Sequence, residues 1–171
     1  GLVTVLFGIA EFDPAFSMIT KSLASLPESS PLTPMLILVI QIFASFSIAP
    51  LFNMLFALGE EIGWRGFLLP KLLPLGQWKA ILISNVIWGF WHAPAIIQGH
   101  NYPDYPVAGI FMMIVFTVLL GTILSWLYLN TNSPWTPAFA HGSINAVASL
   151  SLIFLLPGFD LAIGEIGRAH V

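Results

Sequence analysis

Cysteine is absent from the 171 residues, so the chain has neither a disulfide framework nor a thiolate metal site. Charge is scarce too: Asp, Glu, Lys and Arg make up 8% of the chain, against about 25% in a soluble domain. The net charge of −3 is too small to indicate a nucleic acid partner. Nothing resembles a cleavable signal peptide. These scarcities argue against an ordinary soluble domain and a nucleic-acid-binding protein.

Apolar sequence is abundant instead. Hydrophobic residues make up 57% of the chain, and the mean hydropathy is +0.91. The apolar residues form long blocks, and about 20 of them in a row span a bilayer as a helix. We therefore predict an all-α fold, a polytopic transmembrane helix bundle with about four complete membrane segments and an N-terminal remnant.

The predicted membrane segments are residues 34–69, 78–97, 107–129 and 134–156. Kinks are expected at Pro50 and Pro94, because proline removes a helical hydrogen bond. The connections are predicted to be polar loops at residues 11–33, 70–77 and 98–106, and a tight turn at 130–133. These segments make the protein an integral, multi-pass membrane protein.

Both ends of the chain look artificial. It starts at Gly1 rather than Met, inside an apolar stretch, which indicates a truncated fragment. Residues 1–33 are then a remnant helix and polar loop, 34–156 the transmembrane core, and 157–171 a tail. The last part, 165–171, resembles a translated sequencing adapter. Its ionisable residues are therefore left out of the chemistry: Glu165, Arg168 and His170.

Three groups of polar residues interrupt the apolar segments, at residues 60–65, 88–92 and 141–145. Ionisable side chains inside a membrane are costly and usually functional. The candidate site residues in these groups are Glu60, Glu61, Arg65, His92, His141 and Asn145.

The depth of the three groups indicates that they meet. Lys71 and Lys79 place the loop between them on the cytoplasmic side, together with the turn before the last segment. With a helical rise of about 1.5 Å per residue, Glu61, His92 and His141 lie roughly 15, 20 and 14 Å from that side. All three therefore lie near the middle of a hydrocarbon core about 30 Å thick. We predict one polar cluster inside the bundle.

Residues four apart share a helix face. Glu61 and Arg65 are such a pair, so we expect Arg65 to neutralise Glu61. Glu60 points about 100° away and is left freer to act. His141 and Asn145 are also four apart, so one helix presents both to the same site.

Each group alone also has a structural explanation. Glu61 and Arg65 fit a buried ion pair, His92 fits a hydrogen bond within the bundle, and His141 with Asn145 fits polar contacts between helices. The neighbouring aromatic residues are predicted to pack: Trp88, Phe90 and Trp91. All six candidates at one depth favour a functional cluster.

The patterns EExxxR, aromatic-xxx-His and HxxxN, in this order on separate segments, resemble the CPBP (CAAX protease and bacteriocin-processing, ABI) family of intramembrane proteases. That family includes the CAAX prenyl endopeptidases. The resemblance covers residues 34–156, and the ordered set is more specific than any one motif. The family's second motif is usually FxxxH, whereas this chain has Trp88. Members usually have further spans before this core.

The resemblance implies endopeptidase cleavage of a membrane-associated peptide or lipidated protein, with prenylated CAAX proteins as the best-known substrates. The lipid bilayer is the other implied partner. The implied roles come in pairs: water activation by Glu60 and His92, oxyanion stabilisation by His141 and Asn145, and support of the site by Glu61 and Arg65.

The resemblance leaves metal use open. Glu60, His92 and His141 would supply a carboxylate and two imidazoles, a catalytic zinc set with an open position. The spacing is not HExxH, so no local zinc signature supports that set. We favour the metal-independent, glutamate-dependent mechanism and keep zinc as the alternative.

Two non-enzymatic functions compete with the protease. A membrane transporter or ion carrier also uses buried Glu and His, but transporters often have repeated halves, and the sequence has no repeat. A non-catalytic scaffold would be expected to have lost a motif residue, and all six are present.

Overall fold

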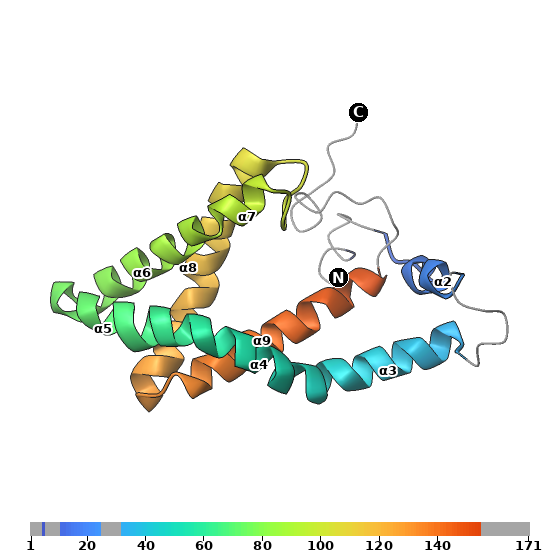
Figure 1. Cartoon of the computed structure of the whole chain (residues 1–171), viewed down its shortest axis with the longest axis horizontal. Helices are drawn as coiled ribbons and strands as arrows, with labels where there is room; N and C mark the ends of the chain where they lie inside the picture. Colours follow the sequence, from blue (N-terminus) through green and yellow to red (C-terminus); the bar gives the residue numbers. More distant parts are fainter. Residues whose placement is uncertain (1–4, 6–10, 25–31, 155–171) are drawn as a thin grey trace. The chain divides into compact units, whose positions relative to one another are not determined.

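The computed structural model describes residue 5 and residues 11–24 and 32–154, and their regular structure is helical (Figure 1). The predicted tail at 157–171 and nearly all of the predicted helical remnant at 1–10 lie outside the described residues. The chain divides into two compact units, Gly1–Pro50 with Ser143–Val171, and Leu51–Gly142. The predicted site residues other than Asn145 belong to the second unit.

The first unit contains α2 (Ser17–Leu23), which lies inside the predicted loop at residues 11–33. That loop prediction was therefore wrong for α2. The carboxylate of Asp13 accepts hydrogen bonds from the backbone amides of Ala15 at 3.0 Å and Ser17 at 2.6 Å. Such bonds satisfy amides at a helix start that have no partner within the helix. Asp13 thus stabilises the start of a helix that the polar composition of this stretch does not predict.

The helix α3 (Pro34–Phe46) starts with a side-chain cap from Thr33 and stops before Ser47, after which α4 (Ile48–Glu61) begins. The predicted kink at Pro50 accounts for this break. A proline ring in a helix clashes with the carbonyl four residues earlier. Four residues before Pro50 is Phe46, the last residue of α3.

The predicted loop at residues 70–77 is mostly helical. The π-helix η1 (Ile62–Leu68) follows α4 directly and is continued by α5 (Leu69–Leu72) and the 3-10 helix η2 (Leu73–Leu75). Both prolines of this stretch lie in the first turns of α5 and η2, where a helix does not need the missing N–H. The chain turns only at Gly76, where φ is 100°.

The helix α6 (Gln77–Trp91) packs along α8 (Pro106–Thr131) in the second unit (Figure 1). A Cβ on Gly89 would lie 2.6 Å from Cα of Ile114, so the missing side chain is what lets the two backbones approach. The expected kink near Pro94 is present as a break at His92, before α7 (Ala93–Ile97). The expected turn at 130–133 is confirmed by Asn132, whose left-handed conformation ends α8.

Two described helical stretches are long and apolar enough to cross a membrane, Gln77–Ile97 and Pro106–Thr131. A third is added if the broken pair Pro34–Phe46 and Ile48–Leu75 forms one span. The predicted segment at 134–156 contains α9 (Trp135–Ala148), of 14 residues, and the 3-10 helix η3 (Ser149–Phe154). The all-α, membrane-type fold is confirmed in the described residues, but four complete spans are not.

One face of α8 is apolar and exposed over about three turns. Its side chains are between 58% and 66% exposed: Phe111, Val115, Leu119 and Ile123. A stripe of this size is typical of a surface that contacts lipid rather than water.

Candidate active site

Glu61 and Arg65 form a buried ion pair where α4 passes into η1. Nη1 of Arg65 donates to Oε1 of Glu61 at 2.9 Å, and the two side chains are 1% and 0% exposed. The predicted pairing is therefore present. Nη2 of Arg65 donates to Oδ1 of Asn85 on α6, at 3.0 Å. The guanidinium also lies 4.3 Å from the centre of the Trp88 ring. Arg65 thus ties the first polar group to α6.

His141 joins the same carboxylate from α9. Its Nδ1 lies 2.9 Å from Oε1 of Glu61, and both side chains are buried. An ionised carboxylate only accepts hydrogen bonds, so Nδ1 of His141 carries the proton. A Cβ on Gly142 would collide with the backbone of Met54, so this glycine permits the close approach of α9 to α4. The first and third groups meet, as their depths predict.

Glu60 has a different environment from Glu61. It is half-buried, and its Oε2 accepts a hydrogen bond from the indole Nε1 of Trp88 at 2.8 Å. The group that donates to Glu60 is therefore neutral, whereas the group that donates to Glu61 is a charged guanidinium. This contrast between neighbouring carboxylates follows the expectation that Arg65 occupies Glu61 and leaves Glu60 freer.

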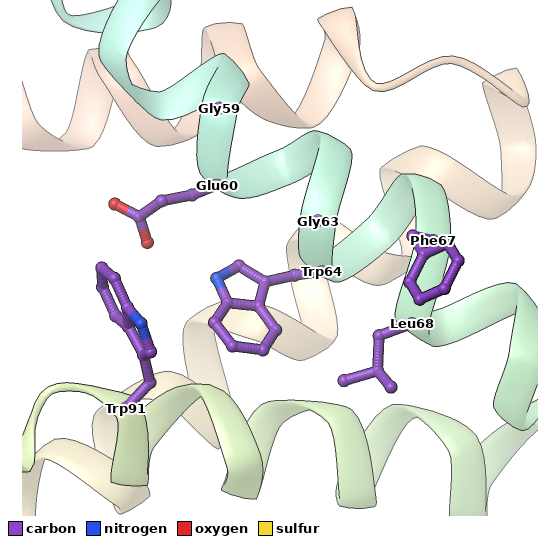
Figure 2. A pocket seen from close by; sticks show the side chains of 7 residues that line it. All are labelled: Gly59, Glu60, Gly63, Trp64, Phe67, Leu68 and Trp91. Atoms are coloured by element: carbon purple, nitrogen blue, oxygen red, sulfur yellow. The ribbon is translucent and has the colours of Figure 1, made fainter.

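Glu60 also lines an open, mostly apolar hollow of about 420 Å³. Figure 2 shows the Glu60 carboxylate and the rings of Trp64 and Trp91 gathered at one end of it, with Phe67 and Leu68 toward the other. Glu60 is the only ionisable residue of the lining, which consists of Gly59, Glu60, Gly63, Trp64, Phe67, Leu68 and Trp91. The hollow therefore combines an apolar lining with a single carboxylate.

His92 lies at the break between α6 and α7, with a half-buried ring. Its Nδ1 is 2.8 Å from the carbonyl oxygen of Trp88. Because a carbonyl only accepts, Nδ1 must donate, and in the neutral ring Nε2 is then the nitrogen with a free lone pair. The ring packs edge-on against Trp91, with centroids 5.1 Å apart. This tautomer is the one that a base acting through Nε2 needs.

Asn145 lies one turn beyond His141 on α9, in the other compact unit, and it is exposed within the described residues. Its placement beside the site stays a prediction.

The zinc set expected from Glu60, His92 and His141 also stays a prediction. In the described part of the chain, no three His, Cys, Asp or Glu side chains lie close enough together to hold a metal ion. Nδ1 of His141 and Nδ1 of His92 both take part in hydrogen bonds. These bonds leave Nε2 of each ring as the ligand atom, but the three side chains are not gathered into a ligand set in the described residues.

Two residues of the cluster were missed by sequence reasoning: Asn85 and Trp88. Both are almost fully buried on α6. Asn85 could have been found from the sequence, because it is a polar residue inside a predicted apolar segment, like the candidates that were chosen. Trp88 was noted for packing and as the aromatic residue of the second motif, but not as a hydrogen-bond donor, because its single N–H has no local partner in the sequence. Their role required the fold, since both bind residues of α4 and η1.

In its described residues the chain is helical and largely apolar, and it buries the ion pair of Glu61 and Arg65 together with His141. These features are those of a membrane protein with a polar centre suited to chemistry. The family model for the type II CAAX prenyl endopeptidase, Rce1-like, matches residues 30–147. The chain therefore belongs to the Rce1-like family of type II CAAX prenyl endopeptidases. Searches of curated proteins and of solved structures gave no match.

Proposed function

We propose that this chain is the catalytic core of an intramembrane endopeptidase, in which Glu60 and His92 activate the water that attacks a peptide carbonyl. The observation that carries the proposal is the position of Glu60. It is the only ionisable residue of an apolar hollow, and the adjacent Glu61 is bound to Arg65 and His141. The family match supports the reaction class.

The first step is removal of a proton from water. Glu60, bound to the indole N–H of Trp88, retains acceptor capacity on its carboxylate. Nε2 of neutral His92 is a second acceptor. A general base must lie within hydrogen-bond reach of the proton it takes. We place the attacking water beside the Glu60 carboxylate, which lines the hollow.

The second step is stabilisation of the oxyanion that forms on the attacked carbonyl. We assign this to His141 together with Asn145. Since Nδ1 of His141 donates to Glu61, donation from Nε2 requires an imidazolium with protons on both nitrogens. Collapse of the tetrahedral intermediate then breaks the C–N bond, and the proton held by Glu60 or His92 passes to the leaving amine.

The substrate is a membrane-associated protein with an apolar group near the scissile bond. The aromatic and aliphatic lining of the hollow favours such a group. A prenylated CAAX-type protein has this chemistry, and the family description names that substrate class.

The test compares wild-type chain, purified in detergent, with Glu60→Gln on prenylated peptides and their unprenylated counterparts. Asp104→Asn is the matched control, because it removes a carboxylate from an exposed loop. We expect Glu60→Gln to lose at least about 100-fold in kcat, the size of a general-base contribution, and Asp104→Asn to keep full activity. Equal cleavage by wild type and Glu60→Gln would refute the assignment.

Parallel arms with chelator and with added zinc address the metal. Full activity in chelator supports the glutamate-dependent mechanism. Loss in chelator with recovery in zinc supports the alternative ligand set. Proton or ion movement into liposomes without any cleavage would instead support the transporter hypothesis.

A further inference from the structure

Trp88 is the side chain at which the polar groups meet. It is 2% exposed, and its ring lies under the Arg65 guanidinium at 4.3 Å. The rings of His141 and His92 are 5.4 and 5.8 Å from it, measured between centroids. Packing accounts for an apolar ring at this place, but a phenyl ring would also pack. Packing therefore does not explain why the ring carries an N–H donor.

The indole nitrogen binds the acid of the hollow. Nε1 of Trp88 donates to Oε2 of Glu60 at 2.8 Å, from α6 to the end of α4. An indole N–H only donates, and it rotates with a ring that is locked by burial. A half-buried carboxylate on a flexible side chain is therefore tied to one of the most rigid groups of the cluster.

The backbone of the same residue holds the histidine. The carbonyl oxygen of Trp88 lies 2.8 Å from Nδ1 of His92, which fixes the tautomer of that ring. One residue thus contacts both proposed proton acceptors, one through its side chain and one through its carbonyl. Replacing the side chain affects Glu60 while leaving the carbonyl in place.

From these contacts we infer that Trp88 is a positioning residue, whose indole N–H holds the Glu60 carboxylate in the orientation that activates water. The hydrogen bond occupies one oxygen and leaves the other to take the proton. The phenylalanine that is usual at this position in the resembled family has no side-chain N–H, so it could not make this contact. Its effect on catalysis rests on the proposed function, whereas the contact itself does not.

The kinetic test is Trp88→Phe in the full chain. Phenylalanine keeps an aromatic ring against Arg65 and both histidines, and it removes the donor together with part of the buried ring volume. We expect kcat to fall by about tenfold to a hundredfold, the effect of misplacing a catalytic group by an ångström or less, while KM stays within about twofold. Trp126→Phe is the matched control, because it removes an indole N–H from an exposed position on α8. It should leave kcat and KM unchanged.

A second measurement does not depend on activity. In protein labelled with ¹⁵N at the tryptophan indoles, the signal absent from Trp88→Phe identifies Nε1–H of Trp88. A hydrogen bond to a carboxylate shifts that proton downfield, so Glu60→Ala should move it upfield, and Asp104→Asn should not.

The two measurements separate the possible failures. An indole signal that does not respond to Glu60→Ala overturns the inference. An unchanged kcat in Trp88→Phe, in a preparation whose wild type is active, overturns it as well. If wild type cleaves nothing but the signal moves as expected, the proposed function fails and the positioning contact stands.

Discussion

Nδ1 of His141 lies 2.9 Å from Oε1 of Glu61, although 80 residues separate the two in sequence. The same oxygen accepts from Arg65, whose partner is only four residues away. A single buried carboxylate oxygen therefore joins a local helical pair to a distant helix. The other oxygen of Glu61 has no hydrogen-bond partner among the described residues.

Glu61→Gln should destabilise the protein strongly. The change leaves the Arg65 guanidinium buried without its counter-charge, which costs about 3–5 kcal/mol. Thermal unfolding in detergent measures the loss. The double variant Glu61→Gln with Arg65→Met removes both charges and should recover a large part of the stability. Equal stability of the single and double variants would contradict a buried ion pair.

Gly121→Ala should disturb the cluster from the side of α8. A Cβ at this position would collide with the Asn85 amide and lie 2.7 Å from Nη2 of Arg65. Overpacking of this kind costs about 1–3 kcal/mol, and we expect a lower unfolding temperature together with weaker activity. Gly59→Ala is the matched control, since a Cβ there meets nothing within 4 Å. The prediction fails if both variants unfold alike.

Gly63→Leu should narrow the hollow without destabilising the fold. Gly63 lines the hollow, and a Cβ there also meets nothing within 4 Å. Leucine is moreover the better helix former, by about 0.8 kcal/mol or less. We expect KM for a peptide with a bulky apolar group to rise several-fold, with little change for a small peptide. A uniform loss on all peptides would argue that the substrate does not enter this hollow.

Asp13 should make the start of α2 sensitive to acid. Burial acts to raise the pKa of Asp13, but hydrogen bonds from Ser17 and Ala15 outweigh it and hold this pKa below its ordinary value of 3.8. A depressed carboxyl pKa stabilises the fold above the ordinary pKa, and the stabilisation is lost as pH falls through the lowered one. The protection of the Ser17 amide against hydrogen exchange, corrected for the intrinsic exchange rate, should therefore fall in that window.

The matched variant for this measurement is Asp13→Asn, which keeps a side-chain oxygen but has no titratable group. Its protection at Ser17, corrected for the intrinsic exchange rate, should be lower than that of wild type near neutral pH and should not change in acid. Identical pH dependence in the two proteins would rule out Asp13 as the titrating group.

The sequence predicts contacts within one helix, and it predicts the depth of polar residues in a membrane. The spacing of Glu61 and Arg65 was sufficient to predict their ion pair, and the depth argument brought His141 to them. The breaks near Pro50 and Pro94 follow from the chemistry of proline. These inferences needed only helix geometry and the cost of burying charge.

Other features depend on contacts that no spacing reveals. The hydrogen bond between Trp88 and Glu60 spans 28 residues, and that between Arg65 and Asn85 spans 20. The start of α2 depends on a single carboxylate in a polar stretch. The π-helix after Glu61 has no marker in the composition, since Gly63 and Gly66 indicate only weak helix preference. The length of the last helix also differs from the predicted segment 134–156: α9 ends at Ala148, although the sequence stays largely apolar up to residue 156.

The long separation between Glu61 and His141 has a consequence for biosynthesis. A chain emerges from the ribosome N-terminus first, and its early elements form before later ones exist. The contact between Glu61 and Arg65 needs only one helical turn, so it is available as soon as α4 and η1 enter the membrane. His141 arrives after about 75 further residues, at a synthesis rate of roughly 5–20 residues per second. For several seconds the newly made chain therefore holds the ion pair without its histidine, and the centre is completed only when α9 is in place.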